Sequence, residues 1–449
     1  MFRFLDREHT VAQPGFNRWL VPPAALSVHL AIGQAYAFSV FNLPLSRLLG
    51  ITKSAPGDWK LTTLGWIFSL AIVCLGLSAA FGGKWVEKAG PRKAMLASAC
   101  CFCGGFLVAA LGVKLHSIAI VYAGYGVLGG IGLGFGYISP VKTLITWFPD
   151  RPGMATGMAI MGFGGGAMIG SPLSVAFMDH FKTPTSMGVW ETFVAMGLIY
   201  FAFMMWGVAT VRVPAPGWAP EGYTASAKPQ KLVTSGQVSA DNAIRTRQFY
   251  LLWMVLFLNV TAGIGVLGQA SAMIQEMFKG RITPAAAAGF VGLLSLFNMG
   301  GRFLWSSASD YLGRKPTYAI YFALGAALYA FTPTTGHLGS VGLFVGTYAV
   351  IMSMYGGGFA TIPAYLRDIF GTAQVSAIHG RLLTAWSAAG VAGPVLVNYI
   401  REYQITHGVA PAQSYSITMY LMAALLLLGF LCNQLVHEVE QRFHDLVTA

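Results

Sequence analysis

The sequence predicts an all-α membrane protein with twelve transmembrane helices arranged as two pseudo-symmetric bundles of six. Three observations lead to this fold class: an apolar composition, a series of long apolar runs, and a repeat that relates the two halves of the chain. The mean hydropathy is +0.61, and only 10% of the 449 residues are charged. Soluble domains carry about 25% charged residues, so the composition favours a chain embedded in lipid.

The apolar runs define the predicted helices in order. A run of about 20 residues crosses about 30 Å of hydrocarbon as a helix, and these runs lack the alternation of barrel strands. Because lipid cannot hydrogen-bond the backbone, each run is expected to be helical. The predicted helices are 19–42, 62–82, 94–113, 118–146, 154–178, 190–211, 247–272, 284–306, 317–333, 340–366, 374–398 and 412–436.

Basic residues predict the orientation in the membrane. With the N-terminus inside, inner loops and tails hold 17 of the 28 Lys and Arg residues, outer loops hold 8, and Lys142, Arg302 and Arg381 lie within helices. This excess predicts that both termini are cytoplasmic, and we expect the cell (inner) membrane. Residues 1–18 are polar, so no cleaved signal peptide is expected. The net charge of +12 then reflects topology and contact with membrane lipids, not nucleic-acid binding.

The chemistry-bearing residue types do not form an enzyme site. All five cysteines lie in apolar helices with no histidine cluster beside them, as expected of packing residues. The chain also lacks a His-Glu-x-x-His motif, a buried acid pair and a Gly-x-Ser-x-Gly elbow. We therefore predict no catalytic residue, no metal and no cofactor.

A polar segment divides the chain into repeated halves. We predict an N-terminal bundle at 1–211, a cytoplasmic linker at 212–246 and a C-terminal bundle at 247–449. Glu87-x-x-Gly90 recurs as Asp310-x-x-Gly313, a shift of 223 residues, and Gly157 recurs at the same shift as Gly380. Duplicated halves with a site at their interface are typical of alternating-access carriers.

Arg302 is the most informative single residue. It lies in the apolar run 286–305, where a cation costs at least ~2.5–3.5 kcal/mol, so a function is expected. All 16 Asp and Glu residues fall in loops, in tails or near segment ends, and none lies as deep as Arg302. We therefore expect the counter-charge to come from an anionic solute, although a structural arginine that reaches to the interface is the alternative.

The repeated loops resemble the signature of the major facilitator superfamily. The first copy is Gly83–Lys93, in which Glu87 replaces the usual Asp, and the second, from Ser306, keeps the acid, the glycine and the basic pair of Asp310–Lys315. Such an acid can cap a neighbouring helix and pair with arginine, forming a latch that breaks as the halves move. The predicted gating residues are Glu87, Gly90, Arg92, Asp310, Gly313 and Arg314.

A narrower resemblance is to the oxalate:formate antiporter family and its lactate and pyruvate relatives. It rests on Gly33–Tyr36, on Tyr137 with Trp147–Gly153, on Asn298–Arg302, and on Tyr355–Phe359 leading to Asp368–Gly371. In that family the helix-eight arginine binds the anion, and aromatic residues of helices one, four and ten wall the pocket. The resemblance assigns substrate contacts to Arg302, Tyr36, Tyr137, Tyr355, Phe359, Asn298 and Trp386.

Two of these positions depart from the relatives. Oxalate exchangers of the family carry a second cation, a lysine, where Trp386 stands here, and one cation in a dry pocket balances only one carboxylate. Monocarboxylate–proton symporters of animal type carry an acidic residue at the position that Asn298 occupies here. At i, i+4 Asn298 shares a helix face with Arg302 and is expected to orient the guanidinium, but it cannot take up a proton.

Four other polar residues in the predicted helices are open to more than one interpretation. His29 is a candidate proton relay, with a neutral packing histidine as the alternative. Lys142 is expected to reach the cytoplasmic interface, and His379 and Arg381 are interpreted as interfacial.

The sequence thus predicts a secondary active transporter of small monocarboxylates (lactate, pyruvate or formate class) that works by alternating access. Proton symport and anion exchange both stay open. The alternative substrate is another organic anion, such as oxalate or a dicarboxylate. A solute receptor is disfavoured by the short tail and a channel by the duplication, and we expect a monomer.

Overall fold

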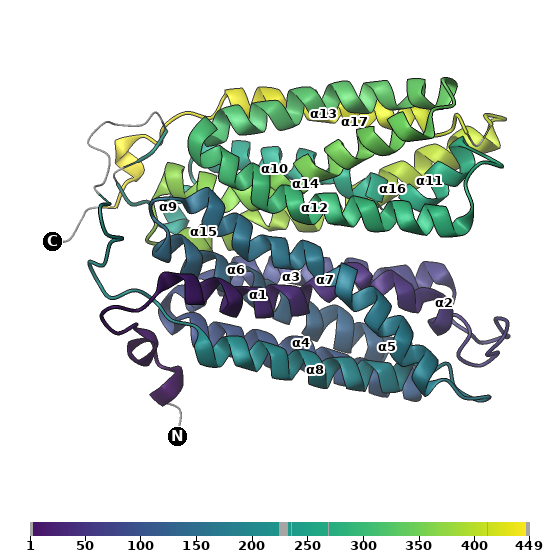
Figure 1. The fold of residues 1–449 in the computed structure, drawn as a ribbon, viewed down its shortest axis with the longest axis horizontal. Helices are drawn as coiled ribbons and strands as arrows, with labels where there is room; N and C mark the ends of the chain where they lie inside the picture. The colour runs from purple at the N-terminus through teal and green to yellow at the C-terminus, as the bar shows by residue number, and fades with distance from the viewer. Residues whose placement is uncertain (1–2, 224–231, 235, 268, 411, 446–449) are drawn as a thin grey trace. The chain divides into compact units, whose positions relative to one another are not determined.

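The computed structural model describes residues 3–223, 232–234, 236–267, 269–410 and 412–445 (Figure 1). Within these ranges the regular elements are helices, and the β-structure is confined to two isolated bridges, Val11–Val213 and Thr183–Ser186. Parts of the predicted linker 212–246, namely 224–231 and 235, lie outside the described residues, as does Gly268 in the predicted helix 247–272. The helical architecture predicted from the sequence is confirmed.

Ten helical stretches in the described part of the chain are long and apolar enough to cross a membrane. They are Arg18–Leu45, Leu61–Ala89, Pro91–Lys114, Ile118–Trp147, Pro152–Phe181, Val189–Thr210, Arg247–Gly265, Val341–Phe370, Val375–Thr406 and Ser416–Gln434. The other two predicted spans correspond to α12 (Pro284–Leu312) and α13 (Arg314–His337). These helices have 29 and 24 residues, so each is long enough to cross the membrane.

Several predicted helices are interrupted, and the breaks coincide with glycines or short turns. The first comprises α1 (Val21–Ile32), the 3-10 helix η4 (Gly33–Phe41) and α2 (Asn42–Leu45). The fourth comprises α5 (Ile118–Val121), the π-helix η5 (Tyr122–Gly129), which contains three glycines, and α6 (Gly130–Trp147). The seventh is divided into α10 (Arg247–Leu267) and α11 (Ala270–Met277), and the eleventh into α15 (Val375–Leu382) and α16 (Thr384–Thr406).

The chain forms two compact units that exchange short segments. Unit 1 comprises 1–150, 158–225 and 374–384, and unit 2 comprises 151–157, 226–373 and 385–449. The first turn of α7 (Pro152–Phe181) therefore belongs to unit 2, and α15 belongs to unit 1. The boundaries predicted from the sequence do not anticipate this exchange and stay a prediction.

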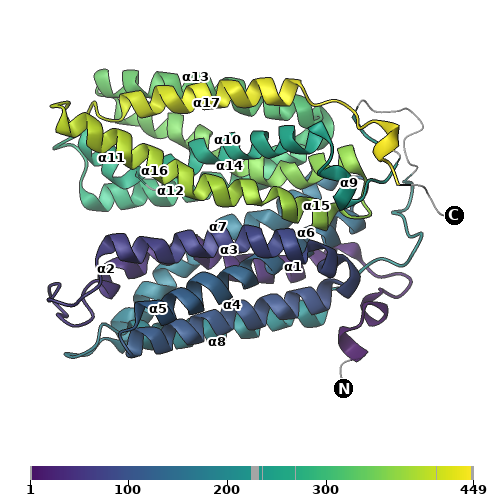
Figure 2. The ribbon, with the colours of Figure 1, turned by 180° about the vertical axis from the view of Figure 1, so that it is seen from behind.

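Unit 1 is built around α4 (Pro91–Lys114), which packs against α8 (Val189–Thr210) and α6. The helix α3 (Leu61–Ala89) packs against both α6 and α15. Figure 2 shows α3, α4 and α8 as neighbouring long helices. This packing brings the end of α3, which carries Glu87, to the start of α15.

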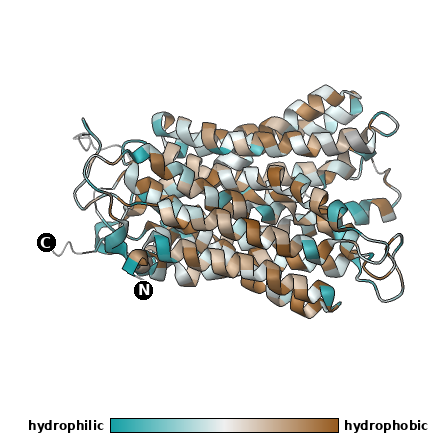
Figure 3. Cartoon of the chain, turned by 60° about the horizontal axis from the view of Figure 1, so that its bottom comes forward, coloured by the Kyte–Doolittle hydropathy of each residue, from teal (hydrophilic) through white to brown (hydrophobic). Residues whose placement is uncertain are grey.

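Unit 2 is built around the pair α12 and α14 (Val341–Phe370), and α13 lies along α17 (Ser416–Gln434) in both views (Figures 1 and 2). Figure 3 shows hydrophobic residues along the long helices and hydrophilic ones mainly in the connecting segments at the helix ends. The short helix α9 (Ala240–Ala243) precedes α10. The α12–α14 contact places Arg302 beside the aromatic residues of α14.

Candidate functional site

Arg302 lies fully buried in the middle of α12, at 0% exposure. Its Nε donates a hydrogen bond to the Asn298 side-chain oxygen at 3.1 Å, one helical turn earlier, as the i, i+4 spacing predicts. The guanidinium carbon lies 5.3 Å from the centre of the Phe359 ring, a distance at which cation and ring attract each other. The structure therefore holds this cation between an amide and an aromatic face.

The other predicted residues of unit 2 surround Phe359. Tyr355, one turn earlier on α14, contacts Phe359 edge-on at 5.3 Å between ring centres, and Trp386 on α16 contacts it at 4.7 Å. All three rings are buried. One cluster is thus formed by Arg302, Asn298, Tyr355, Phe359 and Trp386. The Phe359 ring contacts the Arg302 guanidinium and the neutral indole of Trp386.

The predicted residues of unit 1 contact one aromatic ring. Tyr36 on η4 and Tyr137 on α6 both contact the ring of Phe163 on α7, at 5.0 and 5.4 Å between ring centres. Phe163 is fully buried and was not predicted. The repeat offers the signal that finds it, because Phe163 and Trp386 are separated by the same 223 residues as Glu87 and Asp310.

Two histidines flank Tyr137. The His29 ring lies 5.4 Å from the Tyr137 ring, and the His379 ring lies 5.8 Å from it on α15. The His29 ring nitrogens face two carbonyl oxygens, Nδ1 that of Ala159 and Nε2 that of Tyr137, the latter at 3.1 Å. His379 is only 1% exposed, so its interpretation as an interfacial residue is wrong: α15 packs against α3 and α6 and encloses it.

The acids of the repeated loops bind the first turns of two helices. The Asp310 carboxylate accepts hydrogen bonds from the backbone N–H groups of Gly153 at 2.7 Å and Met154 at 2.8 Å, at the start of α7. We name this contact the α7 latch. Glu87 accepts the backbone N–H of Ser376 at 2.9 Å, at the start of α15, which we name the α15 latch. Carboxylates at these positions complement the helix dipole.

Basic partners complete each latch. Arg314 donates to Asp310 at 2.6 Å and to Asp368 at 3.0 Å. Lys142 forms an ion pair with Glu87, and its expected position at the cytoplasmic interface stays a prediction. Arg92 is buried and donates to the carbonyl oxygens of Phe4 at 2.7 Å and of His9 at 3.1 Å.

The glycines of the repeated motifs have structural reasons to be glycine. Gly90 and Gly313 end α3 and α12 with φ of 82° and 86°, a region that disfavours other residues. A Cβ on Gly157 would lie 2.8 Å from the Arg302 carbonyl oxygen, and one on Gly380 would meet the Ala79 carbonyl oxygen. The gating roles of these residues stay a prediction.

No group of three or more potential metal ligands is found among the described residues. The polar groups that the fold does bring together are suited to binding an anion and to holding helix ends, because they are cations, amides and carboxylates at helix N-termini.

Comparison with known proteins shows which family the chain belongs to. The chain is 29% identical over 380 residues to the oxalate:formate antiporter of Oxalobacter formigenes, covering 84% of this chain and 83% of the relative. It is 24% identical over 447 residues to apicoplast pyruvate carrier 1 of Toxoplasma gondii, covering 87% and 78%.

The crystal structure of the transporter FucP in the outward conformation shares the fold. It has a TM-score of 0.66 at 13% identity and covers 93% of this chain and 99% of that one. The family described as the Major Facilitator Superfamily matches residues 24–394. The chain is therefore an integral membrane transporter, not an enzyme, and it belongs to the major facilitator superfamily.

Proposed function

We propose that this transporter carries small monocarboxylates of the lactate, pyruvate or formate class by alternating access, with Arg302 as the group that binds the carboxylate. The observation that carries the proposal is the fully buried guanidinium on α12, held by Asn298 and placed against Phe359. A planar guanidinium binds a carboxylate through two parallel hydrogen bonds. Burial in a low-dielectric setting strengthens such bonds.

The number of cations near Arg302 supports a monoanion. Trp386, the position at which oxalate exchangers of the family carry lysine, is here an indole that packs on Phe359. Lys142 is paired with Glu87 in unit 1, so this lysine has a partner already. A second carboxylate in the substrate would therefore be left without a compensating charge, which is costly away from water.

The alternative substrate is another organic anion, such as oxalate or a dicarboxylate. One observation favours it: the similarity to the oxalate:formate antiporter extends over 84% of the chain. Similarity to apicoplast pyruvate carrier 1 over 87% of the chain favours the monocarboxylate. We give the monocarboxylate priority because of the neutral Trp386.

His29 is the residue that we propose to carry a coupled proton. Both ring nitrogens face carbonyl oxygens, and only the doubly protonated ring can donate to two acceptors at once. Proton symport is therefore the coupling mode that the geometry favours over anion exchange. Asn298, where relatives of animal type carry an acid, has no titratable proton to contribute.

The remaining features of the proposal follow from topology. Both termini are expected in the cytoplasm on the positive-inside pattern. We also expect the protein to be a monomer in the cell (inner) membrane. The α7 and α15 latches are expected to break and form as the carrier changes between two states. A small organic anion, protons and membrane lipids are the proposed partners.

The test is uptake of labelled lactate, pyruvate, formate and oxalate into proteoliposomes that contain the purified protein. Each acid is supplied with and without an imposed pH gradient, and with and without the same acid inside. Saturable uptake of a monocarboxylate supports the proposal. Uptake of oxalate alone supports the alternative, and no saturable uptake of any of the four acids overturns both.

A further inference from the structure

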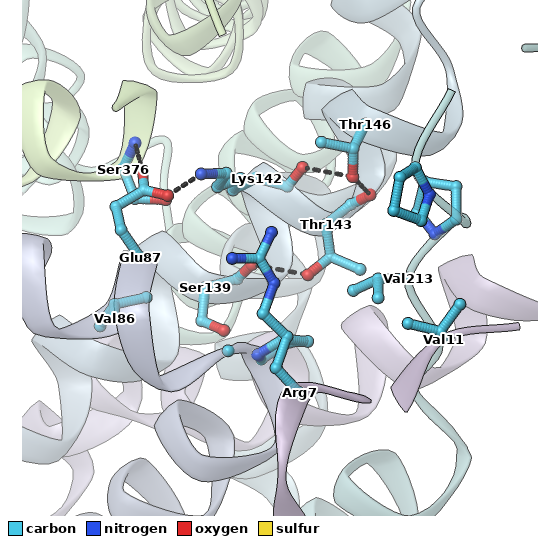
Figure 4. A pocket seen from close by; sticks show the side chains of 14 residues that line it. Arg7, Val11, Val86, Glu87, Ser139, Lys142, Thr143, Thr146, Val213 and Ser376 are labelled. Carbon is cyan, nitrogen blue, oxygen red and sulfur yellow. Dashed lines mark hydrogen bonds and ion pairs between the residues drawn. The ribbon is translucent and has the colours of Figure 1, made fainter. Parts of the chain in front are cut away.

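Unit 1 contains a cavity beside the α15 latch, and its lining includes the latch residues Glu87 and Ser376 (Figure 4). It has a volume of about 150 Å³, which corresponds to about five water molecules in the liquid. The cavity is bounded by the start of the chain, the end of α3, the last turns of α6, the segment after α8 and the start of α15. Its size suits a small polar ligand.

The charged residues of the lining carry a net positive charge. Arg7 and Lys142 contribute two cations, and Glu87 contributes one anion. Both oxygens of Glu87 are engaged, one by the Ser376 backbone N–H at 2.9 Å and the other by Lys142. Arg7 makes no side-chain hydrogen bond or ion pair with any residue that the structure describes. Its guanidinium is therefore the group left to bind an anion.

Two buried hydroxyls in the lining have hydrogen atoms to donate. Ser139 on α6 and Ser376 on α15 are each only 2% exposed, and neither Oγ has a hydrogen-bond partner among the described residues. The hydroxyls of Thr143 and Thr146 already donate to carbonyl oxygens of α6. Since buried polar groups are rarely left unsatisfied, the two serines indicate a ligand that accepts hydrogen bonds.

The start of the chain is fixed in place over this cavity. Arg92 binds the carbonyl oxygens of Phe4 and His9, and Ala12 and Thr10 exchange backbone hydrogen bonds with Val213, both at 2.9 Å. Lys93 lies 2.7 Å from Asp6, and this hydrogen bond lowers the pKa of Asp6. Arg7 is thus held beside α6 and α15, as Figure 4 shows.

We propose that this cavity binds a small oxyanion, with Arg7 supplying the charge and Ser139 and Ser376 donating hydrogen bonds. Inorganic phosphate and a small carboxylate share the required chemistry. The bound anion joins the start of the chain to α6 and α15, next to the α15 latch. None of the residues that line the cavity is a proposed substrate contact, so this proposal does not rest on the proposed substrate.

The experiment measures thermal unfolding of the purified full chain while phosphate is added, against chloride at equal ionic strength. It uses the Arg302→Gln background, so that the proposed substrate site does not contribute, and a second arm replaces phosphate with lactate. A ligand that binds only the folded state raises the midpoint in a saturable manner. The variants are Arg7→Gln, Ser139→Ala with Ser376→Ala, and the matched control Arg3→Gln, which does not line the cavity.

We expect the unfolding midpoint of the Arg302→Gln background to rise in a saturable manner. Adding Arg7→Gln should raise the anion concentration that gives half of this rise at least tenfold, and adding the two serine substitutions should raise it severalfold. Adding Arg3→Gln should leave it unchanged. A response to phosphate alone or to lactate alone identifies the source of the oxyanion. The absence of a saturable rise with either anion, or an equal response in Arg7→Gln, overturns the proposal. Since Arg7 is exposed at the surface, Arg7→Gln is expected to fold. It therefore decides the test if the double serine variant fails to fold.

Discussion

The Glu87 carboxylate binds the backbone N–H of Ser376 as the Asp310 carboxylate binds that of Gly153, at 2.9 and 2.7 Å. Glu87 and Asp310 are 223 residues apart, and so are Gly153 and Ser376. The repeat therefore relates hydrogen bonds as well as residues. Each acid stands at the end of one helix and holds the start of another, which makes the two latches equivalent.

Changing a latch should alter the rate of transport more than substrate binding. Asp310→Asn removes the charge that binds two N–H groups of α7 and Arg314, and hydrogen bonds to charged groups contribute about 1.5–3 kcal/mol. We expect the exchange rate to change at least threefold, with affinity within twofold, and Glu87→Gln to act likewise. Labelled-substrate binding and exchange in proteoliposomes measure both quantities.

Asp150→Asn is the control for the latch variants, because Asp150 pairs with Arg18 and not with a helix N-terminus. A tenfold change in affinity at a constant exchange rate would show that the latches act on the substrate site and not on the conformational change.

Two adjacent glycines of α12 should respond differently to alanine. A Cβ on Gly301 would lie within 2.6 Å of the Ser353 backbone on α14, whereas nothing lies within 4 Å of one on Gly300. Overpacking of this kind costs about 1–3 kcal/mol. Gly301→Ala should separate α12 from α14, lower the unfolding midpoint and weaken substrate binding. Equal midpoints for Gly300→Ala and Gly301→Ala would contradict the observed α12–α14 contact.

The sequence predicted the helices and the fold class well, because long apolar runs have one stable form in lipid. It also predicted the Arg302–Asn298 contact, since i, i+4 neighbours on one helix meet without help from tertiary packing. Contacts between distant segments were harder. His379 was misplaced because its burial depends on α15 packing against α3, which no local pattern specifies. The exchanged segments 151–157 and 374–384 were missed for the same reason.

The proton-coupling proposal predicts a defined pH response of His29. An inward proton gradient should accelerate uptake by the unmodified chain, because protonated His29 can donate to both carbonyl oxygens that face it. His29→Gln keeps two N–H donors but cannot gain a proton, so the acceleration should be lost while exchange of labelled for unlabelled substrate continues. His180→Gln, at an exposed position on α7, is the control.

Gradient-driven accumulation that survives in His29→Gln would rule out this role for the residue. If the rate of uptake by the unmodified chain does not depend on the proton gradient, anion exchange is favoured as the coupling mode.

Trp386 should set the preference between one and two carboxylates. With a neutral indole packed on Phe359, the second carboxylate of oxalate has no compensating cation, and each 1.4 kcal/mol of that cost is tenfold in affinity. We expect lactate or pyruvate to bind at least about tenfold more tightly than oxalate, and Trp386→Lys to shift the preference toward oxalate. Competition of labelled uptake by unlabelled acids at neutral pH measures this. Equal inhibition by oxalate and lactate means that the single-cation argument is wrong.

The most direct test of the account is binding of a labelled monocarboxylate to Arg302→Gln, beside Arg281→Gln, a control arginine that binds the Gly339 carbonyl oxygen. Loss of a bond to a charged group costs about 1.5–3 kcal/mol, which corresponds to about a 10- to 100-fold loss of affinity. Arg302→Lys should also be impaired, because it lacks the planar fork. The account predicts weak binding by both Arg302 variants, with expression and unfolding midpoint near those of the unmodified chain. Unchanged affinity in a well-folded Arg302→Gln would contradict the assignment of Arg302 as the carboxylate-binding residue.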